Sequence, residues 1–409
     1  MGELRQVRRA KQRPQQMRVL EFRHVIDTTG DKMVGYSVIE SAGGKLAEQP
    51  SMTWLTELRP DDAAADLNVQ QNDYRGFHFA ATSADLEASI PSPALDPAVM
   101  FVAQTLAEQG FPGFRAVGVD AGRGVVESFV EMQTPAAEIA HHSEHAYGPD
   151  PEQRLRIYRP SLDTNLPVVV HLHGGGFVLG SLAVVDEVAR DLACRTGAVV
   201  VSGTYRRAPE HRFPAAHDDA LAILQWVREN IAEHGGDPDR IALIGDSAGG
   251  NLAAATALAA SAAAIPISAL ALIYPLIGLA IDTPSRRDYA RGYVIEFDDV
   301  AWLGEQYAAS ETDVTDPRLA LDRVELSGLA GLPPTLLVTN EFDTLRDEAE
   351  VFAERLKAAG VDTTLVRSPG LAHGVFWLSL AVARCAEQRE VVSGFLATRL
   401  AGQPKAVQV

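Results

Sequence analysis

The chain has 409 residues, a formal net charge of −18 and a sequence pI near 5.0. Affinity for nucleic acid comes largely from Lys and Arg against phosphate, so this acidic balance argues against DNA or RNA as a partner. Hydrophobic residues make up 46% and charged residues 22%, which is typical of a folded globular protein. No run reaches the roughly 18 apolar residues that a membrane span needs, so none is expected.

The two cysteines, Cys194 and Cys385, both fall in apolar helical patterns. These patterns predict buried, reduced thiols rather than a disulfide framework or a cysteine metal site, and this favours a cytoplasmic location. Residues 1–16 carry several arginines, but no apolar stretch with a small-residue cleavage site follows them. We interpret this segment as a solvated basic tail.

Residues 17–88 are predicted to form a small β-rich extension. Apolar and polar residues alternate from Leu20 onward, and turn sequences such as the one at 28–31 separate the strand candidates. We expect the extension to serve in packing or in forming an oligomer, such as a homodimer, with a binding module as the alternative. Prolines near residue 91 mark the boundary of the next segment, 89–148, which leads into the main domain.

The segment 89–148 contains one helix candidate and one metal-like motif. A helix is predicted over 97–109. His141, Glu144 and His145 match the His-x-x-Glu-His pattern of some zinc proteases. That chemistry needs both histidines on one face of a stable helix and a third ligand, whereas here the residues alternate and a run rich in Gly and Pro follows. We therefore favour a strand, and we predict neither a metal site nor a cofactor.

From residue 149 to residue 402 the sequence alternates short apolar strands with helices. Repeated strand–helix units predict a mostly parallel sheet with helices on both faces, and active sites on such sheets lie at the carboxyl ends of the strands. Residues 276–325 break the alternation and contain one clear helix, so we expect an insertion that covers the site. The predicted strands are 155–158, 168–172, 198–202, 240–244, 269–274, 335–338 and 363–366, and the predicted helices are 184–195, 215–233, 251–264, 298–307, 347–359 and 383–400.

A serine between glycines lies where one of these strands ends and a helix begins. In Gly245-Asp246-Ser247-Ala248-Gly249, the two glycines lack the Cβ atoms that would clash as strand and helix close on a tight turn. The serine hydroxyl then stands clear of the sheet, and the helix N-terminus directs N–H groups toward a developing oxyanion. Glycines and serines also occur in ordinary turns, but with the motifs below the pattern predicts Ser247 as a nucleophile.

Three consecutive glycines, Gly174, Gly175 and Gly176, come soon after another predicted strand. Without side chains, their backbone N–H groups can approach a substrate closely, as an oxyanion hole requires. A phosphate-binding loop has similar glycine spacing but needs a lysine after its last glycine, where this chain has Ser181. We therefore predict an oxyanion hole.

A nucleophilic serine needs a base, and the base needs an orienting acid. Asp343 follows the predicted strand 335–338 after a short turn, and His373 lies in the loop after the predicted strand 363–366. The chain order Ser, Asp, His is the one found in α/β-hydrolases. Asp347 is the alternative acid, but it falls inside the next helix, where a carboxylate is typical of the first turn.

These motifs resemble the hormone-sensitive lipase family of α/β-hydrolases, in its bacterial esterase branch, from about residue 95 to residue 400. The chain departs from the family at Thr344, where proline is usual, at Val375, where phenylalanine is usual, and in the extension before residue 90. The resemblance rests on His173-Gly174-Gly175-Gly176, on Tyr-Arg-Arg-Ala-Pro-Glu-His-Arg-Phe-Pro-Ala-Ala at 205–216, on Gly245-Asp246-Ser247-Ala248-Gly249-Gly250-Asn251, on Glu341-Phe342-Asp343-Thr344-Leu345-Arg346-Asp347-Glu348 and on His373-Gly374.

The resemblance implies an α/β-hydrolase fold with a helical cap formed by residues near 92–145 and 276–325. It implies a serine carboxylesterase that hydrolyses short- to medium-chain acyl esters through an acyl-enzyme. The alternatives are the same triad acting on an amide, a lactone or a thioester, and a non-catalytic small-molecule receptor, although the plant receptors of this family lack the histidine. The implied site residues are Ser247 as nucleophile, Asp343 as acid, His373 as base, and the amides of Gly174, Gly175, Gly176 and Ala248 as oxyanion hole.

Overall fold

The computed structural model describes residues 20–21, 39–40 and 95–401. The chain divides into two compact units at residue 75, and each is described by itself. In the first unit the described part is a short antiparallel pair, β1 (Leu20–Glu21) with β2 (Ile39–Glu40). The basic tail 1–16 and nearly all of the extension 17–88 lie outside the described residues, so their roles and the homodimer stay predictions.

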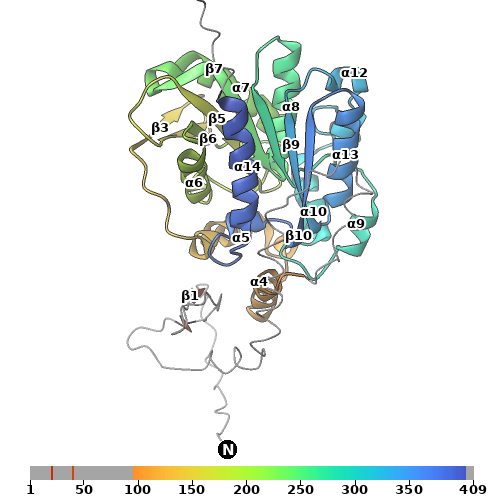
Figure 1. The fold of residues 1–409 in the computed structure, drawn as a ribbon. Coiled ribbons are helices and arrows are strands. Elements are labelled where there is room, and N and C mark those ends of the chain that lie inside the picture. The colour runs from red at the N-terminus through yellow and green to blue at the C-terminus, as the bar shows by residue number, and fades with distance from the viewer. Residues whose placement is uncertain (1–19, 22–38, 41–94, 402–409) are drawn as a thin grey trace, which may run out of the picture. The chain divides into compact units, whose positions relative to one another are not determined.

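An eight-stranded sheet forms the centre of the second unit (Figure 1). Its order is β10 (Thr363–Ala372), β9 (Thr335–Phe342), β8 (Ala269–Ile273), β7 (Gly236–Asp246), β5 (Leu166–Leu172), β6 (Val199–Gly203), β4 (Arg154–Arg159) and β3 (His141–Ala146). Strands β5 to β10 are parallel, while β4 pairs antiparallel with β6 and β3 antiparallel with β4. The central strands are buried on both faces, which explains their continuous apolar runs. The predicted fold class is confirmed.

Helices cover both faces of this sheet. α6 (Asp186–Thr196) and α14 (Cys385–Leu400) lie on one face, and α7 (Ala215–Asn230) and α8 (Ala248–Ala262) lie on the other, with α13 (Arg346–Ala358) against β9 and β10. Across the described residues, no helix combines the length and the apolar character that crossing a membrane requires. Short helical pieces complete the body: η2 (Ile231–His234), η3 (Leu321–Arg323), α12 (Leu326–Leu329) and η4 (Val375–Trp377).

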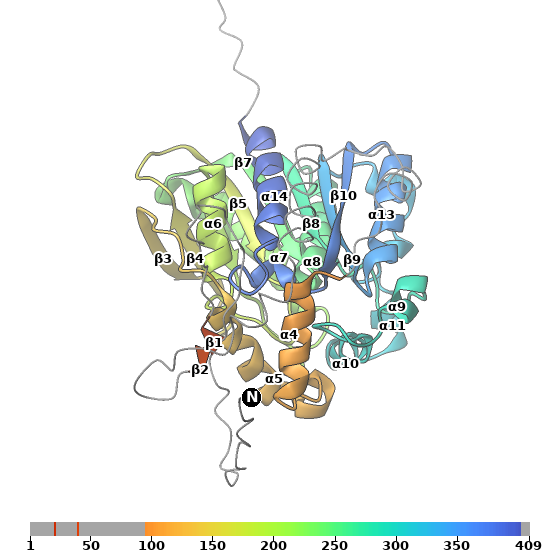
Figure 2. The same cartoon turned by 60° about the horizontal axis from the view of Figure 1, so that its bottom comes forward.

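The cap consists of two segments that are far apart in sequence and gather beyond the same edge of the sheet (Figure 2). The first contains α4 (Pro97–Glu108), α5 (Phe114–Glu127) and η1 (Ser128–Met132), and the second contains α9 (Pro284–Asp288), α10 (Phe297–Tyr307) and α11 (Glu311–Thr315). They meet at Asp299, whose Oδ1 accepts a hydrogen bond from the Arg115 amide at 2.9 Å. The Arg115 side chain also pairs with Glu305 at 2.7 Å. The helices predicted at 97–109 and 298–307 are confirmed.

Several strands are longer than predicted, and for β9 and β10 the difference bears on the site. β9 continues to Phe342 and β10 to Ala372, where these two residues are paired with each other. The Asn340 side chain donates to the Ala372 carbonyl at 2.6 Å and helps to hold this pairing. Asp343 and His373 therefore follow directly on two neighbouring strand ends, rather than lying out in loops.

The prediction of two buried thiols is wrong for one cysteine. Cys385 is buried, whereas Cys194 is exposed, and neither forms a disulfide. On α6 the buried side chains include Val188, Leu192 and Ala193. Cys194 lies on the outer side of that helix, a distinction that composition alone does not make.

Candidate active site

Ser247 sits on a strained turn between β7 and α8. Its φ is +53°, in the left-handed region that residues other than glycine rarely adopt. A Cβ at Gly249 would lie 2.0 Å from the Leu172 carbonyl oxygen, and one at Gly245 would lie 2.1 Å from the Gly249 carbonyl oxygen. Only glycine fits at these two positions, as the motif predicts. The Ser247 amide donates to the Ile273 carbonyl at 2.9 Å, which fixes the turn on the neighbouring strand.

The structure brings Ser247, His373 and Asp343 into one hydrogen-bonded chain. His373 Nε2 lies 2.8 Å from Ser247 Oγ, and His373 Nδ1 lies 2.8 Å from Asp343 Oδ2. Because a carboxylate only accepts, Nδ1 carries the imidazole proton and Nε2 is left to accept from the serine. The second carboxylate oxygen of Asp343 accepts the Leu345 amide at 2.8 Å, so the acid is held from two sides.

Burial and charge act in opposite directions on His373. Burial by itself lowers the pKa of the imidazole, but the charge and hydrogen bond of Asp343 outweigh burial, and Asp246 and Glu348 add to that effect. The net result is a pKa above the ordinary histidine value. The same environment stabilises the imidazolium that forms when His373 takes the serine proton.

The three consecutive glycines are not equivalent. Gly175 has a φ of +106° and Gly176 a φ of +62°, and both line the cavity that contains Ser247 and Ala248. The Gly174 N–H instead donates to Asp246 Oδ1 at 3.1 Å. That amide is therefore engaged in this structure, whereas Gly175, Gly176 and Ala248 are the members of the predicted oxyanion hole that line the cavity.

Asp246 is a site residue that the sequence-based prediction missed. Its side chain is almost fully buried, and a Cβ at Gly174 would lie 2.4 Å from its Oδ2. The residue beside the nucleophile thus holds the start of the glycine loop. The signal in the sequence is its place inside the Gly-x-Ser-x-Gly pattern, but its partner lies 72 residues away.

The cavity around Ser247 is narrow and mostly apolar. Its free volume is about 60 Å³, and both cap segments contribute to it. The apolar side chains that line it include Phe114, Val126 and Phe129 from the first cap segment, Leu279, Ile295, Val300 and Leu303 from the second, and Trp377 from the body. Such a lining suits the hydrocarbon part of an uncharged substrate.

A family model described as the alpha/beta hydrolase fold matches residues 169–377, just over half of the chain. Carboxylesterase NlhH of Mycobacterium tuberculosis is 38% identical over 313 residues, which cover 74% of this chain and 95% of that protein. The chain belongs to the hormone-sensitive lipase family of α/β-hydrolases.

Other members of this family differ in what their names say they do. The solved structure of an esterase from the archaeon Pyrobaculum calidifontis has a TM-score of 0.70 at 37% identity, covering 76% of this chain and 100% of that one. The gibberellin receptor GID1C of Arabidopsis thaliana is 34% identical over 207 residues, which cover 49% of this chain and 60% of that protein. The carboxylesterase matches 74% of this chain and the receptor 49%, so the comparisons identify a carboxylic-ester hydrolase rather than a receptor.

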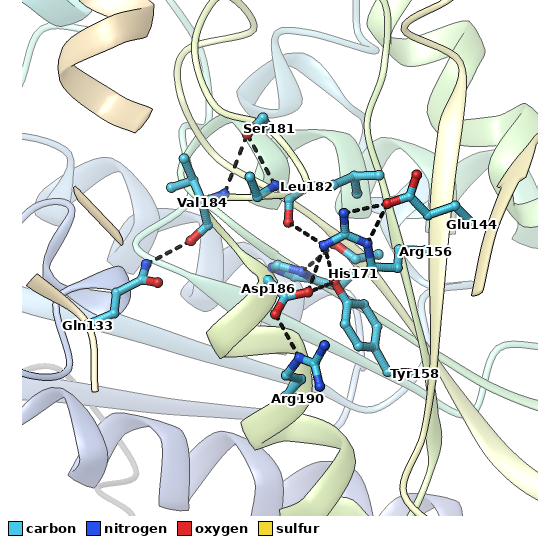
Figure 3. Close-up of polar contacts among 12 residues, drawn as sticks. Gln133, Glu144, Arg156, Tyr158, His171, Ser181, Leu182, Val184, Asp186 and Arg190 are labelled. Carbon is cyan, nitrogen blue, oxygen red and sulfur yellow. Dashed lines mark hydrogen bonds and ion pairs between the residues drawn. The ribbon is translucent and has the colours of Figure 1, made fainter. Parts of the chain in front are cut away.

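A polar network holds the segment that follows the glycine loop (Figure 3). Arg156 on β4 pairs with Asp186 at the start of α6 at 2.7 Å and approaches the Leu182 carbonyl at 3.5 Å. Tyr158 donates to the same Asp186 oxygen at 3.0 Å. This network holds Leu182 and Asp186, in the later part of the segment that joins the glycines to α6.

A second network, which we call the His217 latch, consists of His217, Asn251 and Tyr307. The amide nitrogen of Asn251 donates to the carbonyls of Leu276 and Leu319, so its Oδ1 accepts from His217 Nε2 at 2.9 Å. The other ring nitrogen, Nδ1, then accepts from the Tyr307 hydroxyl at 2.7 Å. Burial lowers the pKa of His217 to about 4, which matches a neutral imidazole with one donor and one acceptor.

The His217 latch joins the cap to the helix that carries the nucleophile. Tyr307 ends α10, while Asn251 lies one turn beyond Ser247 on α8. The Tyr307 ring also stacks on Phe177, the residue after the glycine loop, with ring centroids 4.1 Å apart. These partners lie 34 to 90 residues from His217. Nothing in the sequence near His217 identifies those partners.

Tyr307→Phe is expected to destabilise the protein by about 1–3 kcal/mol, because it leaves the buried Nδ1 of His217 without its donor. The midpoint of urea denaturation, followed by tryptophan fluorescence, measures the change. Tyr289→Phe is the matched control, since its hydroxyl bonds Arg346 at a half-buried position where water can replace it. Equal midpoints for the two variants would contradict a structural role for the latch.

The segment with the zinc-protease pattern is a strand, as its alternation predicts. β3 runs from His141 to Ala146 and pairs with β4. In a strand, two residues four apart are separated by roughly 13 Å along the chain, too far for both to bind one zinc ion. His145 instead packs against His234 and Trp226, with ring centroids 4.5 and 5.5 Å away.

Proposed function

We propose that this chain is a serine carboxylesterase that hydrolyses short- to medium-chain acyl esters through an acyl-enzyme. The observation that carries the proposal is the continuous hydrogen-bonded chain from Asp343 through His373 to Ser247, which ends in an apolar cavity. The similarity to proteins named carboxylesterase and esterase supports it. Ser247 serves as nucleophile, His373 as base and Asp343 as orienting acid.

In the first half of the reaction, Ser247 Oγ attacks the ester carbonyl carbon while His373 Nε2 takes the hydroxyl proton. The carbonyl oxygen becomes negative and accepts hydrogen bonds from the amides of Gly175, Gly176 and Ala248. Collapse of this tetrahedral intermediate breaks the bond to the leaving oxygen. The imidazolium gives its proton to that oxygen, and the alcohol departs.

In the second half, a water molecule takes the place of the alcohol. His373 removes a proton from the water as it attacks the acyl carbon, and the same amides hold the second oxyanion. When the bond to Ser247 breaks, the imidazolium returns the proton to Oγ. The carboxylic acid leaves, and the enzyme is restored without a net change in its protonation.

Two alternatives have specific weaknesses. An amide, a lactone or a thioester passes through the same intermediate, because an oxyanion hole does not distinguish leaving groups. An ester, however, has a better leaving group than an amide, and esters are the substrate class of the related esterases. A non-catalytic receptor has no need of a base at hydrogen-bond distance from the serine, and here His373 lies 2.8 Å from it.

The pH dependence of hydrolysis tests the assignment of the base. Protonated His373 cannot accept the serine proton, so kcat/KM for p-nitrophenyl butyrate is expected to rise with pH through the pKa of the free enzyme. The carboxylate of Asp343 raises that pKa, which places the midpoint of the rise above the ordinary histidine value of about 6.5. A midpoint at or below 6.5 would contradict this environment, and absence of any ester hydrolysis would contradict the proposed function.

A further inference from the structure

A second and larger cavity lies on the other side of α10. It has a volume of about 410 Å³ and is bounded by α9, α10 and α11 of the cap. Three of its residues, Leu279, Val300 and Gly304, also line the cavity around Ser247. The two cavities are therefore separated by a wall formed from these three residues.

This wall is thin at one point. A Cβ placed on Gly304 would lie 2.8 Å from Leu279 Cδ2, so the helix backbone and the leucine side chain are in direct contact. No other side chain fits between them. The Leu279 side chain is therefore the part of the wall that a change of rotamer moves.

The second cavity is apolar inside and polar at its rim. Phe297 and Ala301, which lie one turn apart on α10, line it together with Ala308, which directly follows the helix. Glu305 and Ser310 lie at the edge and are exposed. This arrangement suits a hydrocarbon chain whose end reaches toward solvent.

Arg286 is the one cation that lines this cavity among the described residues, and its nitrogens have partners within the protein. Nε donates to Glu348 at 2.6 Å, while Nη1 and Nη2 donate to the carbonyls of Leu279 and Gly278 at 3.0 and 2.6 Å. A buried guanidinium with these partners does not attract a further carboxylate or phosphate. The cavity is therefore not built for an anion.

The cavity around Ser247 is too small for more than a short acyl group. A space of about 60 Å³ accommodates roughly four to six water-sized groups, which is enough for an acetyl or a butanoyl group. A longer chain needs additional room. The second cavity offers nearly seven times the volume directly behind the wall.

The position of the wall relative to the triad indicates which part of the substrate, the acyl chain or the alcohol, points toward the second cavity. The leaving oxygen must lie next to His373 Nε2 to receive its proton. Ile295 borders this side of the cavity, since its Cδ1 would lie 3.1 Å from a Cβ on Gly374. Helix α10, which carries Val300 and Gly304 of the wall, instead lies against the glycine loop, where Leu303 of that helix would be 2.6 Å from a Cβ on Gly176. The acyl chain, which points away from the leaving oxygen, is the part directed toward α10.

We propose that the cavity behind Leu279 and Gly304 binds the distal part of a medium-chain acyl group, from about the fifth carbon onward, with Leu279 as its gate. This inference rests on the proposed ester hydrolysis and specifies its substrate class. It makes the second cap segment the part of the chain that sets acyl length.

Two ester series test the proposal. The first keeps p-nitrophenol as leaving group and lengthens the acyl chain from acetate to dodecanoate; the second keeps the acetyl group and lengthens the alcohol. Ala301→Phe fills the second cavity from a position that does not line the first. Gln306→Phe is the matched control, because Gln306 lies on the same helix and lines neither cavity. Leu279→Ala removes the gate.

Each buried methylene contributes about fourfold to kcat/KM, so Ala301→Phe is expected to lower this value for octanoate and decanoate by at least tenfold. For acetate, butyrate and the whole alcohol series, kcat/KM of Ala301→Phe should stay within threefold of the wild-type value. For Gln306→Phe, kcat/KM should stay within threefold on every ester. Leu279→Ala should raise the ratio of octanoate to butyrate hydrolysis. These results together would support the acyl assignment.

An unchanged acyl-length profile in both Ala301→Phe and Leu279→Ala, with butyrate hydrolysis intact, would overturn the second cavity while leaving the esterase proposal standing. A loss confined to long alcohols would overturn the acyl assignment. A wild-type protein that hydrolyses no ester of either series would remove the proposed function itself, and with it the inference.

Discussion

Ser247→Ala is expected to lower kcat for p-nitrophenyl butyrate by about 10⁴- to 10⁶-fold. Without Oγ no acyl-enzyme can form, and His373 Nε2 loses the proton donor that lies 2.8 Å from it. The residual rate reflects the oxyanion amides and substrate binding alone, which still assist attack by water. Stopped-flow absorbance at saturating ester separates this loss in kcat from any change in binding.

The substitution should leave the fold intact, because alanine keeps the backbone of the turn and the amide of Ser247 still donates to Ile273. Far-ultraviolet circular dichroism and the thermal midpoint check this point. Ser161→Ala is a suitable control, since this serine is not buried and its hydroxyl bonds only the nearby Asp163 side chain and amide among the described contacts. A Ser247→Ala enzyme with most of its activity would exclude Ser247 as nucleophile.

The features that could be predicted from the sequence are those fixed by local pattern. The alternation of apolar strands and helices predicts the mostly parallel sheet, and the glycines around Ser247 predict the tight turn because a Cβ there would meet backbone atoms at about 2 Å. The positions of Asp343 and His373 could be inferred because parallel strands bring their carboxyl ends to one edge. Even so, β9 and β10 are longer than predicted. The polar residues Thr339, Asn340 and Glu341 interrupt the apolar pattern of β9, and Pro369 and Gly370 interrupt that of β10.

The features that could not be predicted depend on partners far away in the sequence. Asp246 meets the Gly174 amide across 72 residues, and His217 meets Tyr307 across 90. A buried polar group must find a partner, but the sequence does not say which one. The second cavity is harder still to predict, because it is enclosed by side chains of α9, α10 and α11 together with Leu279.

Asp343→Asn is expected to lower kcat by about 10⁴-fold while leaving KM nearly unchanged. The physical reason lies in the two hydrogen bonds of this carboxylate. One oxygen accepts the Leu345 amide and the other accepts His373 Nδ1–H, each at 2.8 Å. An asparagine has only one oxygen for these two donors. Because a backbone N–H cannot become an acceptor, the asparagine oxygen faces Leu345 and its NH₂ group faces the imidazole. His373 then carries its proton on Nε2 and cannot take the serine proton.

Asp347→Asn is the matched comparison, four residues further along. Asp347 lies in the first turn of α13, accepts the Ser285 amide through Oδ2 at 2.8 Å and pairs with Arg346. An asparagine oxygen can still accept from Ser285, so the cost is mainly the loss of a carboxylate at a helix N-terminus, about 0.3–1 kcal/mol. Even if all of this appeared in the activation barrier, kcat would fall by no more than about fivefold.

A hydroxylamine assay distinguishes the two carboxylates further, because an enzyme that acylates Ser247 transfers its acyl group to hydroxylamine as well as to water. In Asp343→Asn both rates should fall in parallel, since the same imidazole activates Ser247 before either acceptor is used. In the same variant, the midpoint of the rise of kcat/KM with pH should move to lower pH, because the carboxylate charge that raises the pKa of His373 is gone. If Asp347→Asn were inactive and Asp343→Asn nearly normal, Asp343 would not be the residue that orients His373, and the 2.8 Å contact between them would have no catalytic meaning.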